Sequence, residues 1–270
     1  MESLFLSVAD IGLLIGLYLG PGVVVAFLGG SVASVFGDRR VGTCSLLMMF
    51  VGSLLMVWGT SFEALALGRV MAGVGGVVVN VLMTKMVIDW FAGRDVATAV
   101  AIFLSSWPVG IGLALVVLPM LAEQGDLRSA WVGISIMTAL ALVAFALIYR
   151  TPEGAEAHGR IRIVGLPWRP LIYAALIWGL YNSAVAMVFG FGPLILFDAG
   201  LSAADASIAT SLFMFAIAVA APLGGRISDA SGRRDTLILF TLVAAVGLLP
   251  LMLYLPASAS WIAYGFAGFL

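Results

Sequence analysis

The residues best suited to chemistry are charged or hydrogen-bonding side chains inside long apolar runs. Arg69 is the clearest case, because it lies a few residues inside an apolar run at 64–88. An ionisable group within a membrane span is costly, so it faces protein or water and marks a functional site by default. We consider two interpretations. Arg69 binds an anionic substrate or takes part in proton coupling, or it extends to the interface and ends the helix.

Two further polar residues follow Arg69 in the same run. Asn80 lies near the middle of the run and is a second candidate for substrate contact or coupling. Lys85 lies closer to the end, four residues before Asp89. This i, i+4 spacing favours an ion pair at the interface over a substrate role.

A second apolar run, at 170–198, gathers hydrogen-bonding side chains near mid-membrane at Trp178, Tyr181 and Asn182. Polar groups at that depth must face protein or water, because lipid offers them no partner. The three residues are therefore candidates for lining a substrate cavity. Ordinary interhelical hydrogen bonds are the alternative interpretation.

The densest group of charges is the segment GGRISDASGRR at 224–234, which lies between two long apolar runs. It contains Arg226, Asp229, Arg233 and Arg234, in a chain with 13 Lys and Arg altogether. Two interpretations explain charges between two apolar runs: a conformational role for this loop, and a role in setting its orientation in the membrane.

The composition indicates which elements position these residues. Of the 270 residues, 63% are hydrophobic and 10% are charged, against roughly 25% charged residues in a soluble domain. Apolar runs of about 20 residues recur, and as α-helices they are long enough to cross a hydrocarbon core about 30 Å thick. We predict an all-α, polytopic transmembrane helix bundle. Its spans are expected at 9–35, 42–60, 64–88, 96–122, 128–149, 170–198, 204–228 and 235–255, with a ninth from about 258.

The polar breaks between these runs alternate in charge. The breaks after the first, third, fifth and seventh runs hold nine arginines, whereas the breaks between them hold only Arg128. The positive-inside rule places the Arg-rich side in the cytoplasm. We expect a multi-pass protein of the inner or plasma membrane with cytoplasmic Arg-rich loops, which contain Arg39, Arg40, Arg94, Arg150, Arg160, Arg162, Arg169, Arg233 and Arg234.

The longest polar interruption is the segment at 150–169, and it predicts the domain boundary. We expect an N-terminal transmembrane half at 1–149, a central cytoplasmic loop at 150–169 and a partial C-terminal transmembrane half at 170–270.

The chain contains an internal repeat. The segment GGSVASVFGDR at 29–39 aligns with the loop at 224–234 at an offset of 195 residues, which is 224 minus 29. The same offset aligns Gly52 with Gly247, Leu54 with Leu249, Ala72 with Ala267 and Gly73 with Gly268, and it places Tyr264 opposite Arg69. The repeat therefore predicts two halves of equal topology, with an even number of helices in each.

Three predicted helices have no partner at this offset, and they are those at 96–122, 128–149 and 170–198. We therefore expect six helices per half, of which this chain carries the second to the tenth and lacks the first helix and the last two. On this interpretation the chain is a fragment. A bundle without those helices exposes cavity-facing polar groups to lipid, so we expect it to be inactive alone.

Two parallel six-helix repeats with a charged, glycine-rich loop after the second helix of each half resemble the major facilitator superfamily. The family's loop pattern, Gly-x-Leu-Ala-Asp-Arg-x-Gly-Arg-Arg, is matched at Gly225, Asp229, Gly232, Arg233 and Arg234. The first copy matches at Gly30, Gly37 and Arg39, but it has Ser34 in place of the Asp and Asp38 in place of an Arg. The family's fourth-helix pattern, Arg-x-x-x-Gly, is matched by Arg69 and Gly73.

The resemblance implies that the two loops form a conformational latch, which holds the halves together in one access state and releases them in the other. Asp229 is able to accept hydrogen bonds from a helix N-terminus, and Ser34 is a weaker, uncharged acceptor. A loop that only sets membrane orientation is the alternative interpretation.

Other classes of protein are not expected. One histidine, His158, and one cysteine, Cys44, give neither a metal site nor a disulfide framework, and we expect no cofactor. We find no catalytic constellation, so we do not expect an enzyme. A net charge of -1 gives no argument for a nucleic-acid partner.

These observations predict a secondary active transporter that moves a small solute by alternating access, as a monomer. The resemblance alone implies the proton gradient as its energy source. Arg69 favours a small organic or inorganic anion as the substrate. The alternatives are efflux of a hydrophobic drug-like compound, and a transporter-like sensor or inactive remnant without transport.

Overall fold

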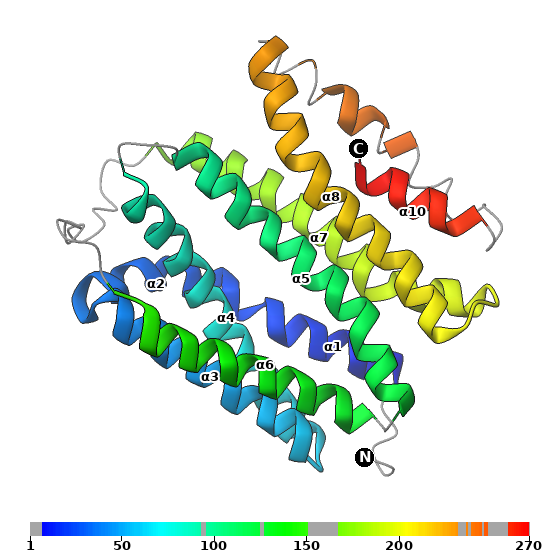
Figure 1. Cartoon of the computed structure of the whole chain (residues 1–270), viewed down its shortest axis with the longest axis horizontal. Coiled ribbons are helices and arrows are strands. Elements are labelled where there is room, and N and C mark those ends of the chain that lie inside the picture. The colour runs from blue at the N-terminus through cyan, green and yellow to red at the C-terminus, as the bar shows by residue number, and fades with distance from the viewer. Residues whose placement is uncertain are drawn as a thin grey trace. The chain divides into compact units, whose positions relative to one another are not determined.

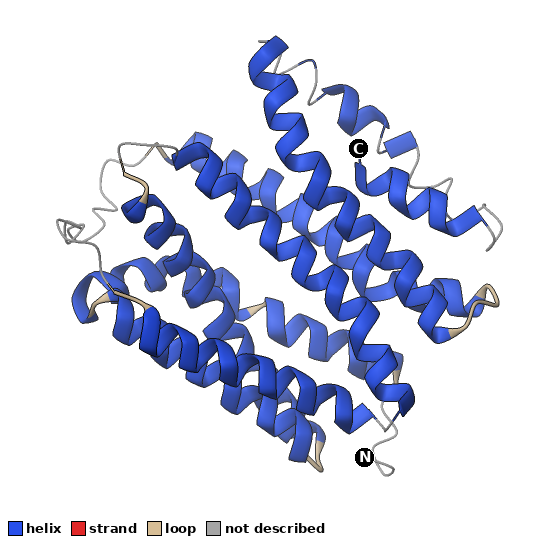
Figure 2. Cartoon of the chain, viewed as in Figure 1, coloured by secondary structure: helices blue, strands red, loops and turns tan. Residues whose placement is uncertain are grey.

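A computed structural model describes residues 7–92, 96–124, 127–150, 167–231, 236, 239–244, 246–247 and 259–269. The regular elements of these residues are all helices, as the sequence predicts (Figure 2). They are α1 (Val8–Leu19), α2 (Pro21–Phe36), α3 (Asp38–Trp58), α4 (Phe62–Trp90), α5 (Val96–Gln124), α6 (Leu127–Ile148), α7 (Trp168–Asp198), α8 (Ala203–Ser231) and α10 (Ser260–Phe269) (Figure 1).

Six of the described helices are long and apolar enough to cross a membrane, and they are α3, α4, α6 and α7 with most of α5 and α8. This finding agrees with the multi-pass class that the composition predicts. The predicted span at 235–255 and the central loop lie largely outside the described residues, which omit 151–166, 232–235 and 248–258. The ninth predicted span corresponds to α10.

The prediction of a single helix at 9–35 is wrong, because this segment forms two helices, α1 and α2, that meet at Gly20 and Pro21. Proline has no backbone N–H and cannot continue the hydrogen-bond pattern of α1. It is well suited to the first turn of a helix, and it occupies that position in α2.

Contacts between Cα atoms divide the chain into two compact units. Unit 1 comprises Met1–Val96 and Leu121–Leu166, and unit 2 comprises Ala97–Met120 and Pro167–Leu270. Most of α5 therefore belongs to unit 2, although the sequence repeat assigns it to the first half. The reason is that Ile111 and Leu115 of α5 pack against the core of unit 2. The sequence halves at 1–149 and 170–270 stay a prediction.

Within unit 1, α4 packs against α1, α2 and α3, and α3 also packs against α6. Small residues let α3 and α4 approach closely. A Cβ atom added to Gly52 would lie 2.6 Å from the carbonyl oxygen of Gly68, and one added to Gly68 would lie 2.8 Å from that of Gly52. Such close packing is how helices associate when lipid supplies no hydrophobic driving force.

Unit 2 is built around a core of apolar side chains from α7, α8 and α10, which includes Val185, Phe213, Met214 and Tyr264. The segment SSWPVGIG at 105–112, whose Pro108, Gly110 and Gly112 predict a kinked or closely packed helix, lies within α5, which continues through Pro108. A Cβ added to Gly112 would lie 2.9 Å from the Phe215 ring, so α5 packs closely at this residue.

The internal repeat is visible in the helices. An offset of 195 residues carries Val8 onto Ala203 and Phe36 onto Ser231, so α1 and α2 together cover the same part of the repeat as α8. The segments that correspond in the sequence repeat therefore also correspond as helices in the two units.

Candidate functional site

Arg69 lies two turns into α4, in contact with two aromatic rings of unit 1. Its guanidinium carbon is 5.4 Å from the centre of the Tyr18 ring in α1 and 5.3 Å from the centre of the Trp131 ring in α6. Ser61 begins the helix, and its Oγ accepts a hydrogen bond from the backbone N–H of Ala64. Arg69 therefore contacts two aromatic residues, Tyr18 and Trp131, that sequence reasoning did not identify as its partners.

Both rings are held by the packing of unit 1. Tyr18 is placed by Gly73, because the backbone carbonyl of Tyr18 lies where a Cβ atom at Gly73 would project. Trp131 packs on a cluster that includes Leu14 and Leu65, and its carbonyl accepts a hydrogen bond from Ser135 Oγ at 2.9 Å. The spacing of Arg69 and Gly73 therefore has a structural basis, since the glycine admits the helix whose tyrosine contacts the arginine.

Arg69 has no acidic partner among the described residues, where the recorded ion pairs join Lys85 to Asp38 and Asp89. Its Nε atom is buried without a hydrogen bond. A cation–π contact contributes about 0.5–2 kcal/mol, which is modest against the cost of removing a charge from water. The site therefore holds a positive charge that is only partly compensated.

The second repeat provides an internal comparison for this site. At the 195-residue offset, Tyr264 of α10 aligns in sequence with Arg69, and Phe213 of α8 aligns with Tyr18. Gly268 admits the backbone carbonyl of Phe213 in the way that Gly73 admits that of Tyr18. Tyr264 is buried in the apolar core of unit 2. This packing arrangement therefore forms without a cation, and Arg69 is not required by the fold.

Asn80 lies on the same side of α4 as Arg69, since eleven residues make about three turns. Its side chain is exposed within unit 1, and its backbone carbonyl accepts a hydrogen bond from Thr84 Oγ1 at 2.9 Å. The two candidates from this helix thus share a face, about 16 Å apart along the axis.

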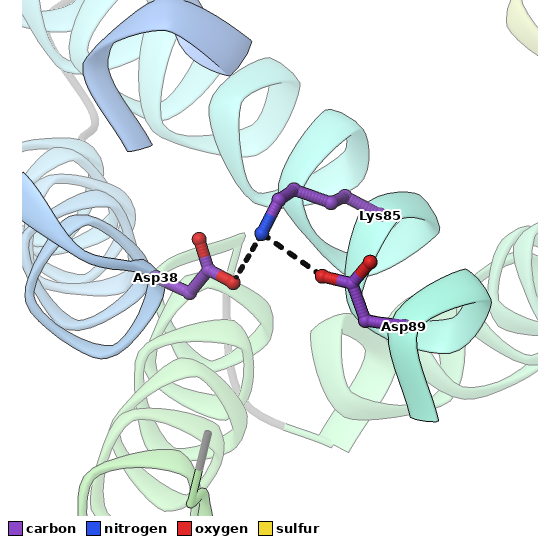
Figure 3. A network of polar contacts seen from close by, with 3 residues as sticks. All are labelled: Asp38, Lys85 and Asp89. Carbon is purple, nitrogen blue, oxygen red and sulfur yellow. Dashed lines mark hydrogen bonds and ion pairs between the residues drawn. The ribbon is translucent and has the colours of Figure 1, made fainter. Parts of the chain in front are cut away.

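Lys85 joins two acidic residues near the end of α4 (Figure 3). Its Nζ lies 2.9 Å from Asp89 Oδ2, which confirms the predicted pair, and 2.7 Å from Asp38 Oδ2. Asp38 is 6% exposed and stands in the first turn of α3, where the helix dipole favours a negative charge. The network ties the start of α3 to the end of α4.

The three candidates of α7 lie close together. The rings of Trp178 and Tyr181 have centres 5.9 Å apart, and Asn182 Nδ2 donates a hydrogen bond to the Trp178 carbonyl at 2.8 Å. The side chains of Trp178 and Tyr181 are exposed within unit 2, and that of Asn182 is partly exposed. Their role in lining a cavity stays a prediction.

Comparison with known proteins places the chain in a family. The sequence matches the family model of the Major Facilitator Superfamily over residues 1–270. The chain belongs to this superfamily. The solved structure of the xylose transporter XylE from E. coli, in an inward open conformation, has a similar fold, with a TM-score of 0.66 at 17% identity over 99% of this chain and 72% of that one.

Several curated relatives of this chain have names that state a substrate, including a dipeptide transporter and a hexuronate transporter. The lysosomal dipeptide transporter MFSD1 of Mus musculus is 25% identical over 95% of the chain and 61% of its own length. The hexuronate transporter of Bacillus subtilis is 22% identical over 84% of the chain and 57% of its own length. The chain thus spans about three fifths of the length of these relatives.

The glycine-rich loop of the first repeat, for which the latch role is predicted, is partly described. Gly37 joins α2 to α3 with a φ of 83°, a conformation that favours glycine. Arg39 donates a hydrogen bond to the Ala146 carbonyl near the end of α6, where a cation is favourable. Gly30 lies in α2. In the described structure, Arg39 thus braces α3 against α6 inside unit 1.

The corresponding loop of the second repeat, at 224–234, lies partly outside the described residues. Gly225 and Asp229 fall within the bounds of α8, and Gly232, Arg233 and Arg234 belong to the part of the chain that is not described. The latch role of this loop stays a prediction.

Sequence reasoning missed three residues of these sites. Tyr18 and Trp131 read as ordinary residues of apolar runs, because nothing in their local sequence points to Arg69. Asp38 was noted only as a departure from the loop pattern. An acid in place of an expected arginine was a signal that a basic partner stands elsewhere, and Lys85 is that partner.

Proposed function

We propose that this facilitator transports a small anionic solute across the membrane by alternating access, and that Arg69 binds the anion. The observation that carries the proposal is the Arg69 guanidinium, which contacts two aromatic rings and no described acid, at a position that the second repeat fills with Tyr264.

An anion would complete the site electrostatically. Aromatic rings stabilise the cation but accept few of the five N–H bonds that a guanidinium offers. The donors that remain are suited to a carboxylate or a similar oxyanion, which binds arginine in a bidentate manner. The rings also leave the charge uncancelled, whereas an acidic neighbour would compete with the solute.

The names of the relatives support the same class of substrate. A hexuronate is an anion, and a dipeptide carries a carboxylate. The likeness to XylE supports the fold alone.

A panel of radiolabelled solutes in proteoliposomes tests the proposal. The panel contains nitrate, D-glucuronate, glycylglycine and hydrophobic amines, and uptake is compared between the wild type and Arg69→Ala. We expect uptake of at least one anion and its loss in Arg69→Ala. Uptake of amines alone, or anion uptake that is unchanged in Arg69→Ala, would contradict the proposal, and the absence of all uptake would favour a sensor or an inactive remnant.

The Arg-rich loops face the cytoplasm in this proposal, and the membrane is the inner or plasma membrane. Nine arginines on one side against one on the other support the orientation. In a Cys44→Ser background, a membrane-impermeant maleimide should label Ala92→Cys only from the cytoplasmic side and Ala199→Cys only from the outside. The reverse pattern would exclude this orientation.

The proton gradient drives the transport in this proposal, as the family resemblance suggests. An imposed inward proton gradient should therefore raise the initial rate of anion uptake several-fold, and a protonophore should cancel the increase. An uptake rate that is unchanged by the proton gradient and by the protonophore would exclude proton coupling.

A further inference from the structure

Tyr18 occupies the space between Arg69 and Asn80 along α4. Its ring centre is 5.4 Å from the Arg69 guanidinium carbon, and its backbone lies against Gly73. Its hydroxyl is directed to Gly76, where an added Cβ would lie 3.1 Å from Oη. Since Asn80 is one turn beyond Gly76 on the same helix, the hydroxyl lies on the face that Arg69 and Asn80 share.

The hydroxyl has no hydrogen-bond partner among the described residues, where the recorded side-chain contact of Tyr18 is with Arg69. The Tyr18 side chain is half-buried, and its hydroxyl is not one of the buried, unpaired side-chain atoms of the described residues, so it is open to a ligand. Tyr18 thus offers a free donor next to a cation without a counter-ion.

The second repeat shows that the packing here does not need this hydroxyl. Phe213 stands at the equivalent position, and its backbone makes the same close approach to Gly268. Relative to unit 2, unit 1 therefore carries two added polar groups at one place, the guanidinium of Arg69 and the hydroxyl of Tyr18. Because the two residues are in contact through the Tyr18 ring, one ligand explains both additions most simply.

We infer that Tyr18 is a specificity-determining residue, whose hydroxyl donates a hydrogen bond to the solute that Arg69 binds. This inference rests on the proposed function. The hydroxyl lies beside Gly76, about two turns along α4 from Arg69, so a solute that contacts both the hydroxyl and the guanidinium must reach from one to the other. The site therefore takes an organic solute with a carboxylate and a second hydrogen-bonding group away from it, as sugar acids and dipeptides have, in preference to a bare inorganic anion.

Equilibrium binding to the purified chain tests this inference, with D-glucuronate, glycylglycine, acetate and nitrate as probes. Tyr18→Phe removes only the hydroxyl and installs the residue of the second repeat. We expect the Kd of D-glucuronate or glycylglycine to rise about tenfold, the value of one hydrogen bond to a ligand, while the Kd of acetate and nitrate changes less than twofold. Tyr173→Phe, at an exposed tyrosine of α7, is the matched control and should change none of these values.

A second variant reaches the same hydroxyl without altering it. In Gly76→Ala the new methyl group would press on Tyr18 Oη, so the binding of D-glucuronate should weaken in the same order as in Tyr18→Phe. Gly12→Ala, in open space on α1, is its control.

The outcomes separate this inference from the proposed function. If Arg69→Tyr abolishes binding while Tyr18→Phe leaves every Kd unchanged, the inference is wrong and the proposed function stands. If Tyr18→Phe weakens nitrate and D-glucuronate equally, the hydroxyl contacts the anionic group and the extended solute is wrong. If Arg69→Tyr leaves every Kd unchanged, the proposed function itself fails.

Discussion

The backbone carbonyl of Tyr18 lies against the α-carbon of Gly73, and the same contact recurs between Phe213 and Gly268 in the second repeat. The recurrence shows that one helix crossing is built twice in this chain. Residues at equivalent positions of the two crossings are therefore comparable. A polar residue that is present in only one of them is not needed for the crossing itself.

Gly73→Ala should destabilise unit 1 by about 1–3 kcal/mol, because the new methyl group overlaps the backbone of α1, which moves only as a whole. Thermal unfolding in detergent, followed by tryptophan fluorescence, measures the effect. Gly12→Ala is the control, since its methyl group meets nothing within 4 Å. Equal melting temperatures for both variants would contradict the close crossing of α1 and α4.

Lys85→Met should destabilise the protein by about 1–3 kcal/mol, because it leaves Asp38 and Asp89 facing one another without a cation. The loss is smaller than for a fully buried pair, since Lys85 is 25% exposed. The triple variant Lys85→Met, Asp38→Asn and Asp89→Asn removes the charges together and should recover most of the stability. A triple variant as unstable as Lys85→Met would show that charge is not the cause.

Trp131→Leu should weaken anion binding about twofold to thirtyfold, because the guanidinium loses a ring that orients it, worth about 0.5–2 kcal/mol. Trp131→Phe keeps a weaker cation–π contact and should give an intermediate Kd. A role in packing alone predicts that both variants lower the melting temperature while the Kd stays constant.

Asp229→Asn should slow transport several-fold while the amount of membrane-inserted protein stays unchanged, if the second loop is the latch. Surface expression and initial uptake rates, measured in the same cells, test this expectation. Arg128→Gln, which removes a charge outside both loops, is the control. Uptake equal to that of the wild type would favour a loop that only sets orientation.

Local sequence patterns predicted the helices and their pairing in the repeat because apolar length and glycine spacing are properties of a single segment. The same holds for Lys85 and Asp89, since an i, i+4 spacing places both side chains on one face of a helix. The contact of Lys85 with Asp38 joins residues 47 positions apart and depends on how α3 meets α4.

The partners of Arg69 were out of reach for a similar reason. Tyr18 and Trp131 come from α1 and α6, and their distances from the guanidinium follow from helix packing. The break between α1 and α2 was readable in the sequence, because Gly20 and Pro21 are adjacent. The apolar run at 9–35 was interpreted as one span on its length alone, but Pro21 cannot continue the hydrogen-bond pattern of α1.

Equilibrium binding of radiolabelled D-glucuronate, glycylglycine and nitrate to the purified chain tests the central claim about Arg69 most directly. The decisive variant is Arg69→Tyr, which installs the residue that the second repeat carries and should keep the fold, with Arg128→Gln as the matched loss of an arginine elsewhere. We predict saturable binding of at least one anion to the wild type and to Arg128→Gln, and a loss of more than tenfold in affinity in Arg69→Tyr. Affinity in a folded Arg69→Tyr protein equal to that of the wild type would contradict the account.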